Sequence, residues 1–449
     1  MSFPPYPCYR PSGVDWLGDV PEHWQIIQSR RLFTQRKERA LTSDRQLTAS
    51  QKHGVIYQDE YLLLEGQKVV QVILGADILK HVEPGDFVIS MRSFQGGIEW
   101  CKCRGCISSA YVMLIPGDAV HGGFFFYLLK SITYIQALQS TTNLVRDGQA
   151  MRFENFTQVD LPLVPVEEQQ QIASFLDRET AKIDALVEEQ KRLIDLLKEK
   201  RQAVITQAVT KGLNVDAPMK PLVNKWLGVV PVSWDVKPLK VVCSYNDDVL
   251  SENTPPDLNI EYVEISDVEA SKGIISSISL KFADSPSRAR RLVQNGDVLV
   301  STVRTYLRAI APVVNPPSNL VVSTGFAVLR PRDIDSSFLG YVCQAEFFIS
   351  DVISRSVGVS YPAINASELV RINVPVPSSS DQRNIGHFLD RETAKIDILI
   401  AEAGAAVGLL RERRSALVSA AVTGKIDLRG LMPASKAEHR EAERMKESA

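Results

Sequence analysis

The sequence predicts an α+β protein with an internal pseudo-two-fold repeat: two mixed α/β domains joined by two long antiparallel coiled-coil helices. Three observations lead to this prediction. The decapeptide FLDRETAKID occurs at 175–184 and again at 388–397. The pattern WLGxVPxxW opens each half, at 16–24 and at 226–234. Each decapeptide lies in a long stretch whose apolar residues recur at helical spacing. Similarity repeated at about half the chain length indicates two copies of one plan.

The composition is that of a soluble globular protein. Of the 449 residues, 45% are hydrophobic and 23% are charged, which is ordinary for this class. No apolar run approaches the ~18–20 residues of a membrane span, and the start MSFPPYPCYR does not resemble a signal peptide. Six cysteines in a chain this long do not make a disulfide scaffold. We therefore expect a cytoplasmic protein. The net charge of −2 leaves room for a basic cleft balanced by acidic surface elsewhere.

The two halves predict the same order of elements. The proline-rich start, 1–15, is expected to be irregular, and the tryptophans of WLGxVPxxW are expected to pack as apolar anchors. Alternating apolar runs bounded by Gly, Pro and Asp predict strands, and longer apolar runs predict a buried helix. The strands are expected at 69–74, 86–90 and 111–115 with a helix at 124–138, and then at 260–265, 297–301 and 324–329 with a helix at 338–353.

A Gly-Asp pair leads into one strand of each half, and an arginine follows the strand. These are Gly85-Asp86 before Arg92, and Gly296-Asp297 before Arg304. The sequences after the two arginines differ completely. The same scaffold is therefore expected to carry different surface chemistry in each half.

The stretch 167–210 contains neither Pro nor Gly and predicts one helix of roughly 60 Å. An amphipathic helix of this length needs a partner, and the other copy, running antiparallel, is the simplest one. The small residues of 403–408 would let the partner helix approach closely. The predicted contact stripes are Ile172, Leu176, Ile183, Leu186, Leu193, Leu197 and Val204, and Ile385, Leu389, Ile396, Leu399, Ala406, Leu410 and Leu417.

The sequence contains no catalytic constellation that we could defend. The phosphate-loop, GxGxxG, HExxH and GxSxG motifs are absent. Asn315-Pro-Pro-Ser318 lacks the aromatic residue of the adenine-methyltransferase motif, and it predicts a loop. The cluster Cys101, Cys103 and Cys106 could supply three zinc ligands, with His121 or Cys8 as a distant fourth. Free thiols at a strand edge are the alternative that we favour.

Arginine and polar residues gather after the strands, in the segments where the halves differ. Arg, Asn and Gln can bond base edges bidentately, whereas Ser and Tyr suit phosphates. The candidate DNA-binding residues are Arg92, Ser93, Gln95, Arg146 and Gln149 in the first half, and Arg304, Thr305, Tyr306, Arg308, Ser360, Tyr361 and Asn365 in the second. Any one of them could equally be an ordinary solvated loop residue.

Taken together, the motifs resemble the DNA-specificity subunit of type I restriction–modification systems. The resemblance rests on WLGxVPxxW, on the Gly-Asp strands followed by arginine, on the run from Pro162 to Glu168-Gln169, and on the FLDRETAKID helix, and it covers about 16–430. The second copy departs from the Glu-Gln pair by having Asp381. The cysteine cluster is not part of the family pattern.

The resemblance implies a division of the chain into recognition and spacer segments. The first target recognition domain would be 1–160 and the first conserved helix 161–213. The second domain would be 214–373 and the second helix 374–430, followed by a disordered polar tail, 431–449. Each domain would read one half of a bipartite, asymmetric target in double-stranded DNA, and the helices would set the spacing between the halves.

The resemblance also implies partners and no catalysis in this chain. Two methyltransferase subunits would dock on the helices, for which we expect the identical surfaces of Phe175, Arg178, Glu179, Phe388, Arg391 and Glu392. Two motor–endonuclease subunits could join them. S-adenosylmethionine, and ATP and Mg for restriction, would be bound by the partners. The alternatives are a self-contained enzyme such as a methyltransferase, and a scaffold whose variable domains bind proteins.

Overall fold

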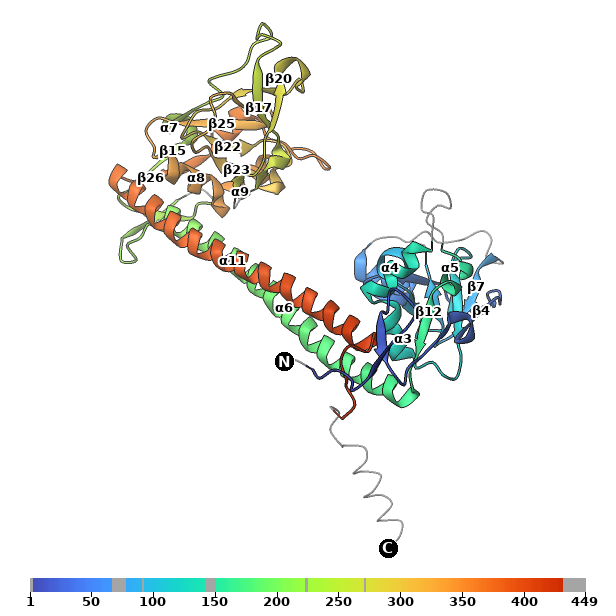
Figure 1. Cartoon of the computed structure of the whole chain (residues 1–449). Coiled ribbons are helices and arrows are strands. Elements are labelled where there is room, and N and C mark those ends of the chain that lie inside the picture. The colour runs from blue at the N-terminus through green and yellow to red at the C-terminus, as the bar shows by residue number, and fades with distance from the viewer. Residues whose placement is uncertain are drawn as a thin grey trace. The chain divides into compact units, whose positions relative to one another are not determined.

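The computed structural model describes residues 3–66, 78–90, 93–141, 151–222, 225–269 and 272–430. The chain divides into two compact units (Figure 1). The first unit consists of Met1–Glu189 and Val407–Ala449, and the second of Gln190–Ala406. Each unit therefore contains one mixed domain, the beginning of the long helix that follows that domain, and the end of the other long helix.

The first unit is built on an antiparallel four-stranded sheet in the order β4 (Phe33–Arg36), β11 (Val112–Pro116), β8 (Phe87–Ile89), β9 (Glu99–Trp100). Phe33 lies at the centre of its core and makes edge-on contacts with Phe87, Phe125 and Phe156. Two-stranded ladders surround the sheet: β1 (Tyr9–Pro11) with β2 (Asp19–Pro21), β3 (Gln25–Gln28) with β12 (Asp160–Leu163), β5 (Leu47–Ser50) with β6 (Gly54–Tyr57), and β7 (Lys80–Val82) with β10 (Gly105–Ile107). The helices of this domain are η1 (Ser29–Arg31), α1 (Gln58–Glu65), α2 (Ser93–Gly96), α3 (Gly122–Leu129), α4 (Ile132–Ser140) and α5 (Phe153–Thr157).

The second unit repeats that sheet as β16 (Cys243–Tyr245), β25 (Phe326–Pro331), β22 (Val298–Ser301), β23 (Ile310–Pro312). It has a further four-stranded sheet, β20 (Ile278–Lys281), β17 (Asn259–Val263), β24 (Leu320–Ser323), β21 (Ala289–Leu292), in which β17 and β24 are parallel. The two-stranded ladders are β13 (Met219–Pro221) with β14 (Val229–Pro231), β15 (Asp235–Pro238) with β26 (Asn373–Val376), and β18 (Val268–Glu269) with β19 (Gly273–Ile274). The helices are α7 (Leu239–Val242), η3 (Ile265–Asp267), η4 (Phe282–Asp284), η5 (Thr305–Leu307), α8 (Ser336–Gln344), α9 (Glu346–Arg355) and α10 (Ala366–Leu369).

Five of the six predicted strands are confirmed to within about two residues at either end, as β8, β11, β17, β22 and β25. The sixth, 69–74, lies outside the described residues. The prediction of an irregular start was wrong, because Tyr9–Pro11 forms β1 and pairs with β2 of the WLGxVPxxW motif.

The single buried helix predicted in each half was wrong, because two shorter helices stand in its place. In the first unit α3 ends at Leu129, and Ser131 caps α4 by accepting a hydrogen bond from the Tyr134 backbone N–H. In the second unit Ala345 is extended between α8 and α9, and the Glu346 N–H donates to Thr206 Oγ1 of the long helix. Apolar periodicity runs through both breaks, so it could not reveal them.

The two long helices are confirmed as α6 (Val166–Lys211) and α11 (Ser379–Val422). In the first unit the beginning of α6 shares a hydrophobic core with the end of α11, and Arg414 bonds Asp184. In the second unit the end of α6 shares a core with the beginning of α11, and Arg201 bonds Asp397. The helices therefore run antiparallel within each unit. No helix among the described residues is both long enough and apolar enough to cross a membrane.

Three positions of the predicted contact stripe are exposed rather than buried. Leu186, Leu193 and Leu399 are 45%, 43% and 48% exposed, whereas Val187 and Ala403 are buried. A straight helix turns every 3.6 residues, so a stripe drawn with a period of 3.5 drifts toward the rim of the contact face. Beside the small residues around Ala403, a hollow of about 320 Å³ lies between the helices, lined by Gln190, Leu193, Leu197, Leu399, Glu402, Ala403 and Ala406.

Candidate nucleic-acid interface

A Gly-Asp pair precedes β8 and β22, and the aspartate of each pair has a buried carboxylate that holds the turn in place. Asp86 accepts two bonds from the Arg36 guanidinium, at 2.6 and 2.9 Å, and one from the Glu83 N–H. Asp297 accepts two bonds from Arg330, both at 2.9 Å, and one from the Gln294 N–H. Paired bonds to a buried carboxylate fix the start of each strand, and so they also fix where the following loop begins.

In the second unit the structure brings together two groups of candidates that are far apart in sequence. The segment after β22 and the segment after α9 are joined by backbone hydrogen bonds, from Arg304 N–H to Pro362 O at 2.8 Å and from Ile364 N–H to Thr302 O at 2.9 Å. We call the surface formed by 264–265, 285–288, 302–308, 323–325 and 356–365 the loop edge. Arg304, Tyr306, Ser360, Tyr361 and Asn365 are all exposed on it.

The loop between β22 and β23 has a strained backbone. Arg304 and Arg308 have φ values of 53° and 54°, in the left-handed region that arginine rarely adopts. The other described non-glycine residues with positive φ are Asn246 and Asn315, a residue type that tolerates this region. Strain of this kind persists where the surrounding structure enforces it, commonly at binding sites. The loop therefore presents Tyr306 and its neighbours in one defined conformation.

The candidates on this loop differ in how available their side chains are. The Arg304 guanidinium lies 4.9 Å from the centre of the Tyr361 ring. Arg308 is bonded by both terminal nitrogens to Glu346, at 2.9 and 3.1 Å. Thr305 is buried and its hydroxyl is 2.9 Å from that of Ser356. Arg304 is thus available to a ligand, whereas Arg308 and Thr305 serve the structure of the loop, and we withdraw Thr305 as a base or phosphate contact.

The first half is described less fully. Ser93 is completely buried and its hydroxyl accepts a hydrogen bond from the Ser90 N–H, so we also withdraw it as a contact. Gln95 is exposed on α2. Arg92, Arg146 and Gln149 lie outside the described residues.

The repeated decapeptide forms the joint between domain and helix. In the first unit the Tyr127 hydroxyl of α3 is 2.7 Å from Asp177 and 3.1 Å from Thr180. In the second unit Tyr341 of α8 makes the same contacts with Asp390 and Thr393, at 2.8 and 3.2 Å. The last decapeptide residue is the aspartate that binds the arginine of the other helix, Asp184 with Arg414 and Asp397 with Arg201. Burial raises the pKa of Tyr127 to about 12, so its hydroxyl remains protonated and can donate.

A glutamine at the beginning of each long helix makes a second joint. Gln169 accepts from the His121 N–H and donates to the carbonyls of Ala119 and Val164. Gln382 accepts from the Asp335 N–H and donates to the Pro377 carbonyl. The preceding residue differs between the copies. Glu168 is buried and accepts from Tyr6 and Trp24, whereas Asp381 is exposed and binds Ser378.

The predicted partner-binding residues fall into two groups. Phe175 is buried and its ring meets that of Phe3 edge-on at 5.2 Å, so it belongs to the core and was wrongly placed on the docking surface; its counterpart Phe388 is partly buried. The other predicted residues, Arg178 with Glu179 and Arg391 with Glu392, lie on the surface and make equivalent contacts in the two units. Glu179 accepts from Lys182 and Arg178, and Glu392 accepts from Lys395 and Arg391. Hydrogen bonds from the lysines first, and then from the arginines, lower the pKa of both glutamates, so each cluster stays charged.

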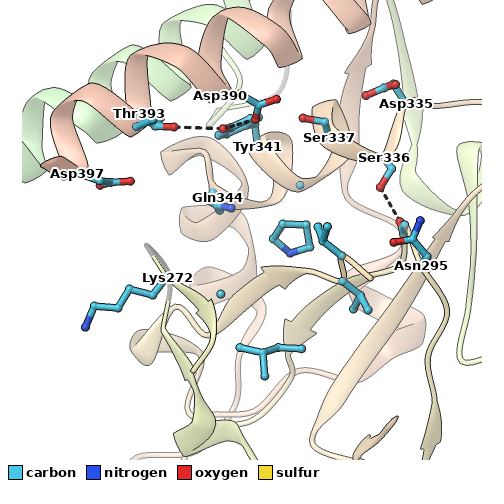
Figure 2. Close-up of a pocket in the computed structure, with 18 of the residues that line it drawn as sticks. Lys272, Asn295, Asp335, Ser336, Ser337, Tyr341, Gln344, Asp390, Thr393 and Asp397 are labelled. Carbon is cyan, nitrogen blue, oxygen red and sulfur yellow. Dashed lines mark hydrogen bonds between the residues drawn. The ribbon is translucent and has the colours of Figure 1, made fainter. Parts of the chain in front are cut away.

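A cleft of about 810 Å³ with a mixed polar and apolar lining lies beside the joint of the second unit, between α8, α11 and the β19–β23 region (Figure 2). Tyr341, Asp390 and Thr393 lie together on one wall, and Ser336 donates to the Gly296 carbonyl at 2.7 Å on another (Figure 2). The described part of the chain contains no cluster of His, Cys, Asp or Glu that could hold a metal ion.

The remaining motifs fit structural roles. Cys101 and Cys106 are buried free thiols, and Cys101 donates to the Cys103 carbonyl at 3.0 Å. Burial raises the pKa of Cys101 to about 12, which keeps it an unreactive thiol. Asn315 is a turn residue whose N–H donates to Asn295 Oδ1.

Comparison with known proteins agrees with the repeat. The model of the type I restriction modification DNA specificity domain matches the chain twice, over 21–195 and 231–402. The chain belongs to this family. It is 22% identical to the type I restriction enzyme MjaVIII specificity subunit of Methanocaldococcus jannaschii over 92% of this chain and 95% of that one. It is 21% identical to the EcoBI specificity subunit of Escherichia coli, over 77% and 74%.

The fold agrees as well. A solved structure from a study of the assembly and conformational transition of the type I R-M system superposes with a TM-score of 0.68, at 16% identity, over 90% of this chain and 98% of that one. Specificity subunits of this family are not themselves catalytic.

Two polar residues that the sequence did not single out also lie on the loop edge. Arg288 and Thr324 are exposed there, although they precede β21 and β25 rather than following the Gly-Asp strand. The parallel pairing of β17 with β24 brings them to this edge, and no local sequence signal reveals such a pairing.

Proposed function

We propose that this chain is the DNA-specificity subunit of a type I restriction–modification complex, in which each domain reads one half of a bipartite asymmetric target in double-stranded DNA. The observation that carries this proposal is a contrast between the repeats. The Tyr–Asp–Thr joint is the same in both units, with contacts that agree within 0.1 Å. The sequences that follow Arg92 and Arg304, by contrast, differ completely. Two different reading surfaces on one repeated scaffold suit an asymmetric target.

The loop edge suggests how the second domain reads its half-site. Arg304 is exposed and its backbone is fixed in a rare conformation, so little entropy is lost when it binds. Its guanidinium can donate two parallel bonds to guanine O6 and N7, worth roughly 1–3 kcal/mol of discrimination. Tyr361 holds the guanidinium from one side, and Tyr306 and Ser360 can donate to phosphates.

The helices supply surfaces that suit two identical partners. The exposed leucines Leu186 and Leu399 occupy equivalent positions in the repeat, one in each unit. The clusters of Arg178 with Glu179 and of Arg391 with Glu392 are also equivalent. We infer that one methyltransferase subunit covers each set. Those subunits would bind S-adenosylmethionine, and two motor–endonuclease subunits with ATP and Mg would complete a restriction enzyme.

The test is reconstitution with the methyltransferase subunits of the same system. The complex should methylate adenines in a bipartite motif, detected by methylation-sensitive sequencing of DNA from cells that express it, and Arg304→Ala should relax only the half-site of the second domain. Methylation by the chain alone would favour the self-contained enzyme. A complex that forms but shows no salt-dependent DNA shift would favour the protein-binding scaffold.

A further inference from the structure

The topology of the second unit places Arg288 on the same edge as the reading loop. Because β17 and β24 are parallel, their carboxyl ends meet at one edge of their sheet, where Glu264 and Thr324 follow them. The Thr324 N–H donates to the Arg288 carbonyl at 2.8 Å, and the Thr302 N–H donates to the Gly325 carbonyl at 2.8 Å. A continuous set of backbone bonds thus runs from Arg288 through the β24–β25 turn to the loop that carries Arg304.

The Arg288 side chain is oriented rather than free. Its Nη2 group donates to Glu264 Oε1 at 2.7 Å and its Nε group is 3.3 Å from the Tyr262 hydroxyl. Tyr262 is buried, so the guanidinium is anchored to the body of the sheet. The side chain is still 57% exposed. A guanidinium carries five N–H donors, and those on Nη1 are not used by these two contacts.

The charges around the loop edge single out two arginines. Arg308 is bound by Glu346 through both terminal nitrogens, and Arg355 is bound by Asp351 through Nε and Nη2. Arg304 lies against an aromatic ring, and Arg288 makes one ion pair at a single terminal nitrogen. Of these arginines, Arg304 and Arg288 are therefore the ones whose charge is available to a polyanion. They lie at two places along the loop edge.

We propose that Arg288 binds a backbone phosphate of the half-site read by the second domain and thereby sets the register of that domain on the duplex. This inference rests on the proposed DNA-reading function. We favour a phosphate over a base as the ligand of Arg288, because the carboxylate of Glu264 holds the Arg288 guanidinium at the edge of the sheet. The side chain that we assign to base reading, Arg304, is carried instead by the strained loop. Phosphate contacts fix orientation and carry no sequence information directly.

The experiment compares Arg288→Ala with Arg371→Ala in the complete methyltransferase complex. Arg371 is a matched control because it is 59% exposed and pairs with Glu368 at 2.8 Å. Its neighbours Val370 and Ile372 bond α7, not the loop edge. Affinity is measured between ~0.05 and ~0.3 M salt, on the intact target and on a duplex whose second half-site is scrambled.

Arg288→Ala should weaken binding to both duplexes by the same factor, roughly three- to tenfold near 0.15 M salt, and lower the slope of log K against log salt by about one. Arg288→Lys, which keeps the charge, should restore most of the slope. Arg371→Ala should match the wild type. Thermal midpoints of all variants show whether folding is intact.

Three results separate the ideas. An unchanged slope for folded Arg288→Ala overturns the phosphate assignment. A loss confined to the intact target also overturns it, because Arg288 would then read bases. If the wild-type complex itself does not distinguish the two duplexes, the proposed function fails rather than this inference.

Discussion

At the scale of single residues, the carboxylate of the Gly-Asp turn joins the fold to the reading surface. Asp297 is buried and holds both Arg330 and the backbone of the turn before β22. The strand that it starts leads directly into the strained loop of Arg304. The sequence reveals the turn but not that its aspartate is a buried ion-pair partner, because Arg330 lies in β25, three strands after β22 in the chain.

Asp297→Ala should destabilise the second unit by about 3 kcal/mol, because it leaves a partly buried guanidinium and a backbone N–H without their main partner. The free energy of unfolding, followed by urea denaturation, provides the measurement. Asp284→Ala removes an exposed carboxylate from the same unit and should change stability by less than about 0.5 kcal/mol. Equal effects of the two substitutions would show that the buried pair contributes little.

The first unit contains a buried histidine between two carboxylates. His81 Nδ1 is 2.6 Å from Asp44, its Nε2 is 2.7 Å from Glu83, and Arg104 lies 3.5 Å from Glu83. Burial alone would lower the pKa of His81, but the hydrogen bonds with Asp44 and Glu83 outweigh it and raise the pKa above 6.5. The protonated form therefore belongs to the folded state.

A raised pKa in the folded state means that this stabilisation is complete below pH 6.5 and is lost as the pH rises through the folded-state value. The thermal midpoint of the first unit should therefore fall as the pH rises above about 6.5. His81→Gln should lower the midpoint at pH 6 and flatten this dependence. If the variant kept the wild-type slope, another group would be responsible.

At the scale of elements, each long helix ends on a glycine that packs against a tryptophan of WLGxVPxxW. Gly212 has φ of 75° and lies against Trp234, and Gly424 has φ of 72° and lies against Trp24. A Cβ at Gly424 would meet Pro21 at 2.4 Å. The end of α11 thus completes the core of the first unit, and the end of α6 completes that of the second.

Gly424→Ala should destabilise the first unit by about 1–3 kcal/mol, from the left-handed backbone and the contact with Pro21. Gly408→Ala is the matched control, since Gly408 lies within α11 in the same unit and a Cβ there meets nothing within 4 Å. That control should stabilise the helix by about 0.5–1 kcal/mol. The thermal midpoints of the two variants provide the measurement. Midpoints that shift in the same direction for both variants would contradict the packing argument.

The elements also show where sequence reasoning succeeds and where it does not. The long helices and most strands were predictable because their periodicity extends over many residues. The breaks at Ser131 and Ala345 were not, since caps and contacts with α6 create them. The same applies to the site. The position of Arg304 after a strand was visible, but the burial of Thr305 and Ser93 and the joining of 302–304 to 362–364 depend on tertiary contacts.

At the scale of the whole molecule, the segment that follows α11 binds the N-terminal segment of the described chain within the first unit. The Asp427 N–H donates to the Pro4 carbonyl at 2.7 Å, and the Tyr9 hydroxyl donates to the Gly424 carbonyl at 3.0 Å. In the second unit the corresponding segments, the end of α6 and β13, are joined by a continuous chain. Both units therefore join the end of a long helix to the first strand of a mixed domain, and in the first unit these segments come from opposite ends of the described residues.

If the helix pair measures the spacer of the DNA target, both helices must be lengthened together. An insertion after Thr210 alone would fall in the buried end of α6, next to the contact of Gly212 with Trp234. Seven residues placed after Glu189 and seven after Ala406 leave the ion pairs of Asp184 with Arg414 and of Arg201 with Asp397 intact, because each pair lies within one unit.

The added length is roughly 10 Å at 1.5 Å per residue, which corresponds to at most about three base pairs. Methylation-sensitive sequencing should show both half-sites unchanged and a longer spacer between them. The insertion after Glu189 alone is the control, and it should impair assembly because α11 no longer matches α6 in length. Altered half-sites with an unchanged spacer would contradict the ruler, and the spacing would then have to be set by the partner subunits.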